Sequence, residues 1–500
     1  MVYEGGEAIY MNRIWKQMGI TIGIMACLTG CGKQESFADV SLKATEKVDI
    51  SFKEVSVHDP SVVKDGQNYY IFGSHLAGAK SEDLMNWSMI GNSVKKGNPI
   101  IDDPLNEMKE AFNWAKTGTF WAPDVIQLAD GRYYMYYCNC EGSSPLSALG
   151  IAVSDQIEGP YKDEGILLKS GMTDTPSENG DFYDATVYPN VVDPCVFYDA
   201  QGKLWMMYGS YSGGIYILEL DTKTGRPIES GYGKKLLGGN HLRIEGSYVL
   251  YNAQTQYYYM FLSFGGLDAD GGYNIRVCRS ENPDGPYYDS MGNEMIDCAG
   301  ADGTFFDDRT AEKYGTKLMG NYKWIWKEGE DGERRNGLLS PGHNSAIYEE
   351  ESGKYYIIFH TRFEGKGDAH QVRVHQMFFN ADGWPVLAPY RYTQESIGSY
   401  QKSDVAGIYK YINHGHEISE AINESTEITL YSNGKIEGAV SGKWKLIGDH
   451  DVELTINKKT YRGVFAEEYD EFGEKYVMTF TALSTETGQS IWGSNIAARN

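Results

Sequence analysis

Three acidic residues stand where short strand-like segments begin. Asp59 and Asp193 each precede a proline, and Glu245 precedes Gly246. Glycosidic bonds are cleaved by two carboxyl groups on opposite sides of the bond, one protonated and one ionised, and a third acid nearby raises the pKa of the donor. These three residues could supply the protonated carboxyl group, the ionised one and the third acid. An aspartate before proline is also common in turns, where it accepts backbone hydrogen bonds, so neither aspartate alone indicates catalysis.

A strand pattern that recurs five times between Val57 and Trp384 would position these acids. Each copy opens with a polar residue beside proline or glycine, continues through a turn into an aromatic-rich strand, and ends in a further strand. Repeated units of this kind are typical of β-propellers. We therefore predict an all-β chain, a five-bladed β-propeller with a small C-terminal antiparallel β-barrel. The aromatic-rich strands are 69–72, 133–137, 204–208, 257–261 and 355–359.

The residues that open the five copies should form a ring. Equivalent strands of a propeller start around one end of its central axis, so their first residues gather there. The ring contains Asp59, Asp124, Asp193, Glu245 and His343. A repeat alone does not require acids at most of its openings, and this favours a functional interpretation. Asp124 could orient a neighbour or bind a loop, and we leave it outside the predicted catalytic set.

The N-terminal residues predict export. An apolar run over 18–28 follows basic residues and is too short to span a membrane, which is typical of a signal peptide. Residues 1–10 are acidic and untypical of a signal peptide, so we expect translation to start at Met11. The run ends in Leu28-Thr29-Gly30-Cys31, which resembles the bacterial lipobox, in which the cysteine is acylated. We therefore expect a secreted, cell-surface lipoprotein whose only membrane contact is a lipid anchor at Cys31.

Composition divides the chain into four segments. We expect a signal peptide at 1–31, a polar tether at 32–48, the propeller at 49–397 and the barrel at 403–500. The barrel segment alternates short strands and turns, including the hairpin signal Asn433-Gly434. A net charge of −24 argues against nucleic acid and anionic membrane surfaces as partners. A neutral polymer remains compatible with this charge, and we expect a monomer.

Longer motifs around the ring resemble glycoside hydrolase family 43. The resemblance covers nearly all of residues 50–395, and the C-terminal segment resembles the lipocalin-like barrel that accompanies some arabinanases of this family. The motifs shared with the family include 57–61, 69–75, 81–87, 120–124, 192–194 and 243–246, while 208–214, 263–266 and 340–345 resemble its endo-1,5-α-L-arabinanases in particular.

The resemblance implies an inverting, endo-acting glycosidase that cleaves α-1,5-L-arabinofuranosidic bonds in arabinan or arabino-oligosaccharides. It implies that Asp59 is the general base, Asp193 the pKa modulator and Glu245 the general acid. It also implies that His343 holds a hydrated calcium ion on the propeller axis. Calcium prefers oxygen ligands, and without the family a lone histidine at a strand start would be interpreted as structural.

Three residues near the ring are predicted to bind substrate. Phe120 and Trp121 are candidates for stacking on furanose rings, with core packing as the alternative. Arg243 could bind a sugar hydroxyl or a carboxylate partner. The basic and aromatic run 323–327 is interpreted either as the rim of a groove or as the cover of a hydrophobic patch.

Two other functions stay open at this point. One is an exo-acting α-L-arabinofuranosidase or β-xylosidase of the same family, which would release only monosaccharide from a linear chain. The other is a surface propeller that binds glycans without cleaving them, which would show binding without turnover.

Overall fold

The structure is a computed structural model that describes residues 50–326 and 336–498. The predicted signal peptide, the tether and Cys31 lie outside the described residues. Within the described ranges, no helix is both long and apolar enough to cross a membrane. The α-helices in these ranges are short: α1 (Pro104–Glu107), α2 (Lys109–Ala115), α3 (Asp308–Ala311) and α4 (Lys402–Val405).

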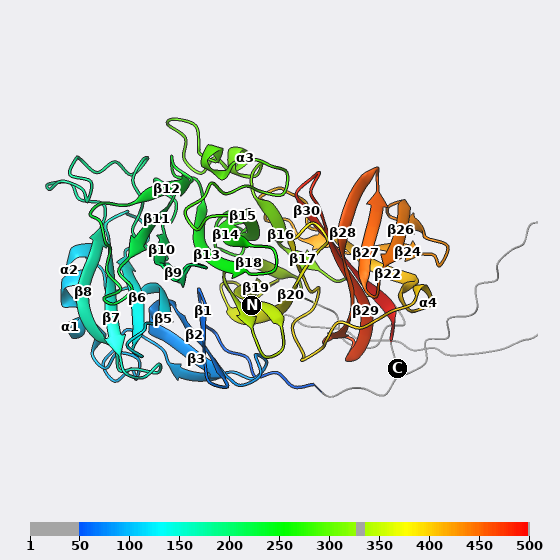
Figure 1. Cartoon of the computed structure of the whole chain (residues 1–500), viewed down its shortest axis with the longest axis horizontal. Helices are drawn as coiled ribbons and strands as arrows, with labels where there is room; N and C mark the ends of the chain where they lie inside the picture. Colours follow the sequence, from blue (N-terminus) through cyan, green and yellow to red (C-terminus); the bar gives the residue numbers. More distant parts are fainter. Residues whose placement is uncertain (1–49, 327–335, 499–500) are drawn as a thin grey trace, which may run out of the picture. The chain divides into compact units, whose positions relative to one another are not determined.

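Three sheets of the described chain each consist of four consecutive antiparallel strands, the arrangement of a propeller blade (Figure 1). The first contains β1 (Ser61–Asp65), β2 (Asn68–Gly73), β3 (Ala77–Ser81) and β4 (Ser88–Gly91). The second contains β5 (Trp121–Gln127), β6 (Tyr133–Cys140), β7 (Ser147–Ser154) and β8 (Lys162–Lys169). The third contains β9 (Cys195–Tyr198), β10 (Leu204–Tyr208), β11 (Ile215–Leu220) and β12 (Lys234–Leu237).

A fourth unit of four strands is joined to the C-terminal domain, because its last strand pairs in parallel with β30 (Gln489–Ala498). Its strands are β13 (Ile244–Asn252), β14 (Tyr257–Phe264), β15 (Asn274–Ser280) and β16 (Thr316–Met319). The remaining propeller strands lie in a six-stranded sheet. That sheet contains β17 (Tyr322–Lys323), β18 (Leu338–Glu349), β19 (Lys354–Phe363), β20 (His370–Phe379), β21 (Pro385–Leu387) and β23 (Asn423–Glu424).

The predicted all-β, propeller-like fold is confirmed, but the predicted count of five blades is not. The described chain has four such blades and one six-stranded sheet. The extra strands explain the difference, because Tyr322 of β17 pairs with Leu338 on one side and, in parallel, with Asn423 on the other. Partners so far apart in sequence leave no trace in a repeat pattern.

The predicted C-terminal barrel is confirmed. Eight strands close into a ring, because β30 pairs with both β29 (Lys475–Ser484) and β22 (Gly407–Asn413). The predicted hairpin turn lies between β24 and β25, where Gly434 has a φ of 87° that favours glycine. The other barrel strands are β24 (Thr426–Leu430), β25 (Lys435–Gly438), β26 (Gly442–Ile447), β27 (Asp451–Ile456) and β28 (Lys459–Asp470).

The barrel and the propeller share a hydrophobic core. Trp324, which is 2% exposed, stacks on Tyr390 with ring centroids 5.7 Å apart and on Trp492 of β30 at 6.5 Å. Side chains of β14, β19, β28 and β29 belong to the same buried cluster. Trp324 therefore covers a hydrophobic core, which is one of the two interpretations of the run 323–327.

A buried carboxyl group also joins the two parts. Glu468 of β28 is 1% exposed, and its Oε2 accepts a hydrogen bond from the backbone N–H of Tyr390 at 2.8 Å. Its Oε1 lies 2.6 Å from Oγ1 of Thr479, which also lies 2.9 Å from the carbonyl oxygen of Ala466. The hydroxyl group of Thr479 has one proton and can donate it to only one of these two oxygens. The contacts therefore favour a protonated Glu468, which donates to Thr479 while Thr479 donates to the carbonyl oxygen of Ala466. Burial raises the pKa of Glu468 well above its ordinary value, in the same direction.

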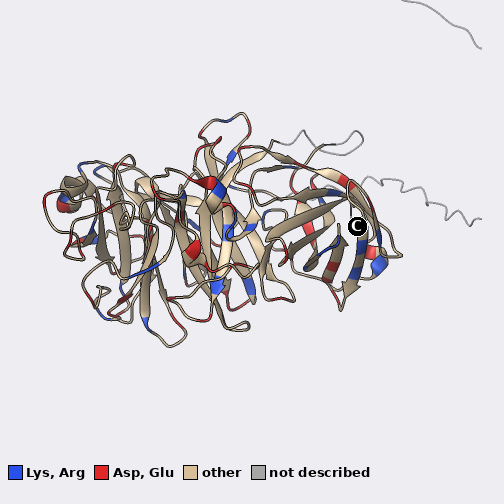
Figure 2. Ribbon diagram, turned by 90° about the horizontal axis from the view of Figure 1, so that it is seen from above, with Lys and Arg blue, Asp and Glu red and all other residues tan. Residues whose placement is uncertain are grey.

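Positions of charged residues do not separate by sign along the ribbon in Figure 2. Asp and Glu, drawn red, are interspersed with Lys and Arg, drawn blue, along the loops and strands.

Candidate active site

Three of the five predicted ring residues share an unusual backbone conformation. Asp59, Asp193 and His343 have φ angles of 57°, 56° and 43°, in the left-handed region that residues other than glycine rarely adopt. Glu245 is followed by Gly246, whose φ is 58°. Such a conformation costs about 1–3 kcal/mol per residue and is concentrated at functional sites. The sheets thus hold the chain in the same bend just before β1 and β9, and within β18 at His343.

Two of the three predicted acids line one cavity. Asp193, 7% exposed, and Glu245, 9% exposed, border a cavity of about 320 Å³ together with Trp121 and Tyr211. Asp59 is 4% exposed and does not border this cavity, but its negative charge raises the pKa of Asp193. The structure therefore brings the three acids into one electrostatic site.

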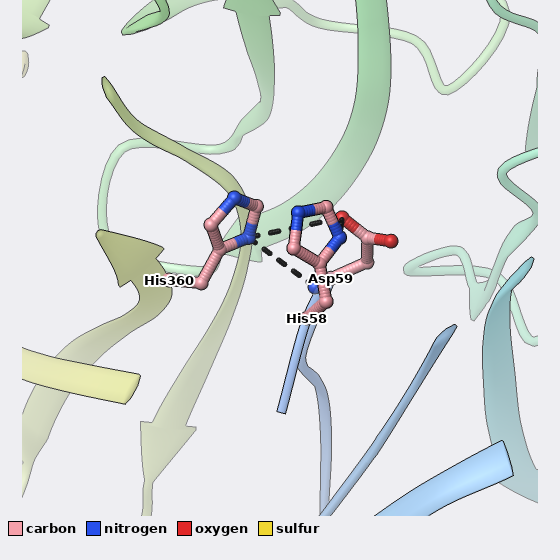
Figure 3. A group of neighbouring side chains, drawn as sticks. All are labelled: His58, Asp59 and His360. Carbon is pink, nitrogen blue, oxygen red and sulfur yellow. Dashed lines mark hydrogen bonds and ion pairs between the residues drawn. The ribbon is translucent and has the colours of Figure 1, made fainter. Parts of the chain in front are cut away.

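Asp59 is held in its ionised form. Its Oδ1 lies 2.7 Å from Nδ1 of His58 and 3.1 Å from Nδ1 of His343, while the hydroxyl of Ser74 donates to Oδ2. Burial alone would raise the pKa of Asp59, but the charges of His343 and His58 outweigh it and hold the pKa well below its ordinary value. His360 completes the group, because its Nδ1 accepts the backbone N–H of Asp59 at 3.2 Å (Figure 3).

His343 supplies positive charge to all three acids. Burial acts against its protonated form, yet Asp59, Asp193 and Glu245 together raise the pKa of His343 to about 10. The same burial raises the pKa of Asp193 to about 7, with Glu245 and Asp59 adding to the rise and His343 opposing it. At neutral pH the site therefore combines an ionised Asp59 with an imidazolium, and Asp193 keeps its proton to higher pH than an ordinary aspartate.

Glu245 is fixed by two hydroxyl groups. Ser210 Oγ donates to its Oε2 at 2.7 Å, and the hydroxyl of Tyr273 donates to its Oε1 at 2.9 Å. The ring of Tyr273 passes close to Gly342, where a Cβ atom would lie 2.1 Å from Cε1 of the ring. Gly342 is therefore needed for the tyrosine to reach Glu245.

Sequence reasoning did not single out several of these partners. His58, Ser74 and Ser210 lie inside motifs shared with the family, which was a usable signal. Tyr273 and His360 lie outside those motifs, and their positions depend on packing between sheets. No pattern in the sequence marks them.

The predicted substrate-binding residues occupy different environments. Phe120 is fully buried and stacks on Tyr137 at 5.9 Å, which corrects the predicted sugar contact to core packing. Trp121 borders the cavity, and its indole N–H lies 2.7 Å from the carbonyl oxygen of Cys140. Arg243 binds Asp308 through two nitrogens, with Nε 3.1 Å from Oδ1. Of its two predicted partners, a sugar hydroxyl and a carboxylate, the structure contains the carboxylate.

Asp124 connects three sheets. It is 3% exposed and accepts hydrogen bonds from the hydroxyl of Ser61 at the start of β1 and, at 2.6 Å, from the backbone N–H of Val196 in β9. Burial raises the pKa of Asp124 to about 6. These contacts favour a structural role, in agreement with its exclusion from the predicted catalytic set.

The atoms around the imidazole ring of His343 determine whether this site can hold the predicted calcium ion. Nδ1 of His343 faces Asp59, so Nε2 is the nitrogen that could hold a ligand, once it has lost its proton. A Cβ atom on Gly246 would lie 3.0 Å from the His343 ring, and the residues that follow these two, Ser247 and Asn344, have buried side-chain oxygens without hydrogen-bond partners in the described structure. Such oxygens suit the water shell of a hard cation. The residues therefore fit an ion held largely through water.

Another group has the composition of a metal site. One ligand atom each from His58, Asp59 and His360 lies within 4.8 Å of the others (Figure 3). The guanidinium of Arg362, however, approaches Nε2 of His360 to 3.5 Å and Nε2 of His58 to 3.4 Å. A cation beside both rings disfavours a second cation between them, so this group is better explained as support for Asp59.

The comparison with protein families decides the membership of the chain. The model of glycosyl hydrolases family 43 matches residues 49–385, and a C-terminal lipocalin-like domain matches 389–493. The chain belongs to glycosyl hydrolases family 43.

Relatives of this family 43 chain resemble it over almost their whole length. An extracellular endo-α-(1→5)-L-arabinanase of Bacillus subtilis is 57% identical over 89% of this chain and 93% of its own. A crystal structure of a family 43 glycoside hydrolase from Bacillus licheniformis has a TM-score of 0.86 and 60% identity, covering 89% of this chain and 99% of that one. An endo-1,5-α-L-arabinanase structure from Thermotoga petrophila has a TM-score of 0.85 and 50% identity, with coverage of 89% and 99%.

Proposed function

We propose that this chain is an endo-acting arabinanase that hydrolyses α-1,5-linked L-arabinofuranosyl bonds within arabinan, with inversion. The observation that carries the proposal is the relative named an extracellular endo-α-(1→5)-L-arabinanase, which is 57% identical and matched over 93% of its length. The site supports it, because the family 43 acids of this chain are all present and interact. In this proposal the six-stranded sheet closes the propeller ring, since β18 packs against both β1 and β13.

Asp59 is the proposed general base. Its carboxylate is ionised, and His58, His343 and Ser74 fix its orientation. It accepts a proton from water as the water oxygen attacks the anomeric carbon. An inverting enzyme keeps its base and acid about 6.5–9.5 Å apart to admit this water.

Asp193 and Glu245 form the proposed proton-donating pair. Neighbouring carboxyl groups in a buried site share a proton, because both cannot be ionised cheaply. With the pKa of Asp193 raised to about 7, the pair keeps a proton in weakly acidic solution. Glu245, held by Ser210 and Tyr273, delivers it to the leaving glycosidic oxygen as the bond to the anomeric carbon breaks. Asp193 then serves as the modulator that keeps the proton in the pair.

We also propose that His343 helps to hold a hydrated calcium ion through Nε2, which must release its proton for the ion to bind. When bound, calcium supplies positive charge that stabilises the ionised carboxylates. Metal analysis of the purified enzyme, and a thermal shift on adding calcium after chelation, test the site directly. A His343→Gln variant should lose both signals, and equal signals in variant and wild type would refute the assignment.

Product analysis on linear and branched arabinan tests the activity. The endo enzyme should release a range of arabino-oligosaccharides, whereas an exo enzyme would release only monosaccharide. Asp59→Ala and Glu245→Ala should each abolish this release while circular dichroism shows an intact fold. Full activity in either variant, or binding of arabinan without turnover by the wild type, would overturn the proposal.

Export and assembly are part of the proposal. The relatives are named extracellular, which supports secretion, and Cys31 would carry the lipid anchor. Incorporation of labelled fatty acid in expressing cells should disappear in Cys31→Ala, and its persistence would contradict the anchor. We propose a monomer, which light scattering tests.

A further inference from the structure

Two adjacent phenylalanines are exposed beside the proposed catalytic acids. Phe305 is 66% exposed and Phe306 is 45% exposed, on the segment between β15 and β16. Both border the cavity that Asp193 and Glu245 line. We propose that these rings form an aromatic platform on which a furanose ring of the bound arabinan chain stacks. This inference rests on the proposed function and extends it to the sugars beyond the cleaved bond.

The rings of the platform are held in place, and one of them keeps a large free surface. His241 stacks on Phe305 with centroids 4.3 Å apart and an interplanar angle of 24°. Tyr211 meets Phe306 edge to face at 5.7 Å. Because His241 covers one face of Phe305 and the residue is still 66% exposed, its other surface is open to a ligand. Single exposed apolar residues are common on protein surfaces, but a fixed pair of exposed aromatic rings at a catalytic cavity indicates a binding surface.

The platform is tied to the strand that carries Glu245. Arg243 lies two residues before Glu245, binds Asp308 with two nitrogens, and places its guanidinium 5.5 Å from the centre of the Phe306 ring. Asp307 accepts the backbone N–H of Thr310 and so caps α3 directly after the two phenylalanines. Arg243 is therefore a positioning residue for the platform, and Asp308 is the carboxylate partner that the sequence analysis weighed against a sugar hydroxyl.

The chemistry of the platform matches a furanose. Aromatic rings bind flat apolar surfaces, and the C–H groups of a sugar ring provide one while its hydroxyls remain in water. The platform lies beside the acids and does not hydrogen-bond to any of them among the described contacts. The platform therefore contributes the same binding energy in the ground state and in the transition state. Stacking on it should lower KM without changing kcat.

The test compares Phe305→Ala, Phe305→Leu and Phe305→Tyr on linear arabinan and on linear arabino-oligosaccharides of increasing length. Loss of one aromatic contact should raise KM about 3- to 10-fold on the polymer and the longer oligosaccharides. The shortest cleaved oligosaccharide should be almost unaffected, and kcat should stay constant. Leu keeps an apolar side chain but no flat ring, so it should behave like Ala, whereas Tyr should restore KM.

Phe182→Ala is the matched control, because Phe182 is 85% exposed and does not border this cavity. It should leave every KM unchanged. Wild-type KM in Phe305→Ala on all chain lengths would refute the platform, and so would an equal loss on all lengths, which would indicate a structural role. If the wild type itself does not cleave arabinan, the proposed function fails before the platform is tested.

Discussion

Removing the imidazole of His58 tests how the site keeps its base ionised. His58 places Nδ1 2.7 Å from Oδ1 of Asp59, and both side chains are largely buried, at 12% and 4% exposure. A hydrogen bond to a charged group contributes about 1.5–3 kcal/mol. His58→Ala should therefore lower kcat/KM about 10- to 150-fold, since each 1.36 kcal/mol corresponds to a factor of about ten in rate.

The sign of the pH effect follows from the same contact. The charge of His58 lowers the pKa of Asp59, so its removal raises that pKa and protonates the base at higher pH. The acidic limb of the kcat/KM profile should move towards neutral pH. His58→Asn can restore a donor near Oδ1 without restoring the charge, so it should recover part of the activity.

Linear arabinan and the pH profile of kcat/KM provide the assay. His370→Ala is the control, because its ring meets His58 edge-on at 5.0 Å and its Nε2 pairs with Ser56 at 3.0 Å, not with Asp59. A profile of His58→Ala with the wild-type acidic limb would refute the reasoning, even if the overall rate fell.

Two further predictions concern packing. Glu468→Gln should raise the free energy of unfolding at neutral pH by about 1–3 kcal/mol, since an amide needs no buried charge and can donate to Thr479. The raised pKa of Glu468 costs stability as pH rises above the ordinary value of 4.5, so chemical denaturation of the two proteins should coincide in acid and diverge above it; a constant difference would contradict this. Gly342→Ala should displace Tyr273 from Glu245 and lower kcat at least about tenfold, whereas wild-type kcat would show that the contact is dispensable.

The sequence located the strand openings because each unit repeats a local pattern of turn and aromatic strand. It therefore predicted which acids would approach one another, and Asp193 and Glu245 do share a cavity. It could not count the sheets correctly, because β17 finds its partner β23 across about a hundred residues of intervening chain. It also could not find Phe305, because an exposed aromatic in an irregular segment has no periodicity.

Two motifs that look alike in the sequence carry carboxyl groups of opposite character. Asp59 and Asp193 both precede proline and share a left-handed backbone, yet the pKa of the first is lowered and that of the second is raised. Burial raises the pKa of both carboxyl groups, so the difference between the two pKa values comes from their interaction partners. Asp59 has two imidazoles and a hydroxyl, whereas the hydrogen bond found for Asp193 comes from the backbone N–H of Gly246 at 3.3 Å. A motif thus locates a carboxyl group at a strand opening, and the neighbouring sheets determine whether it holds a proton.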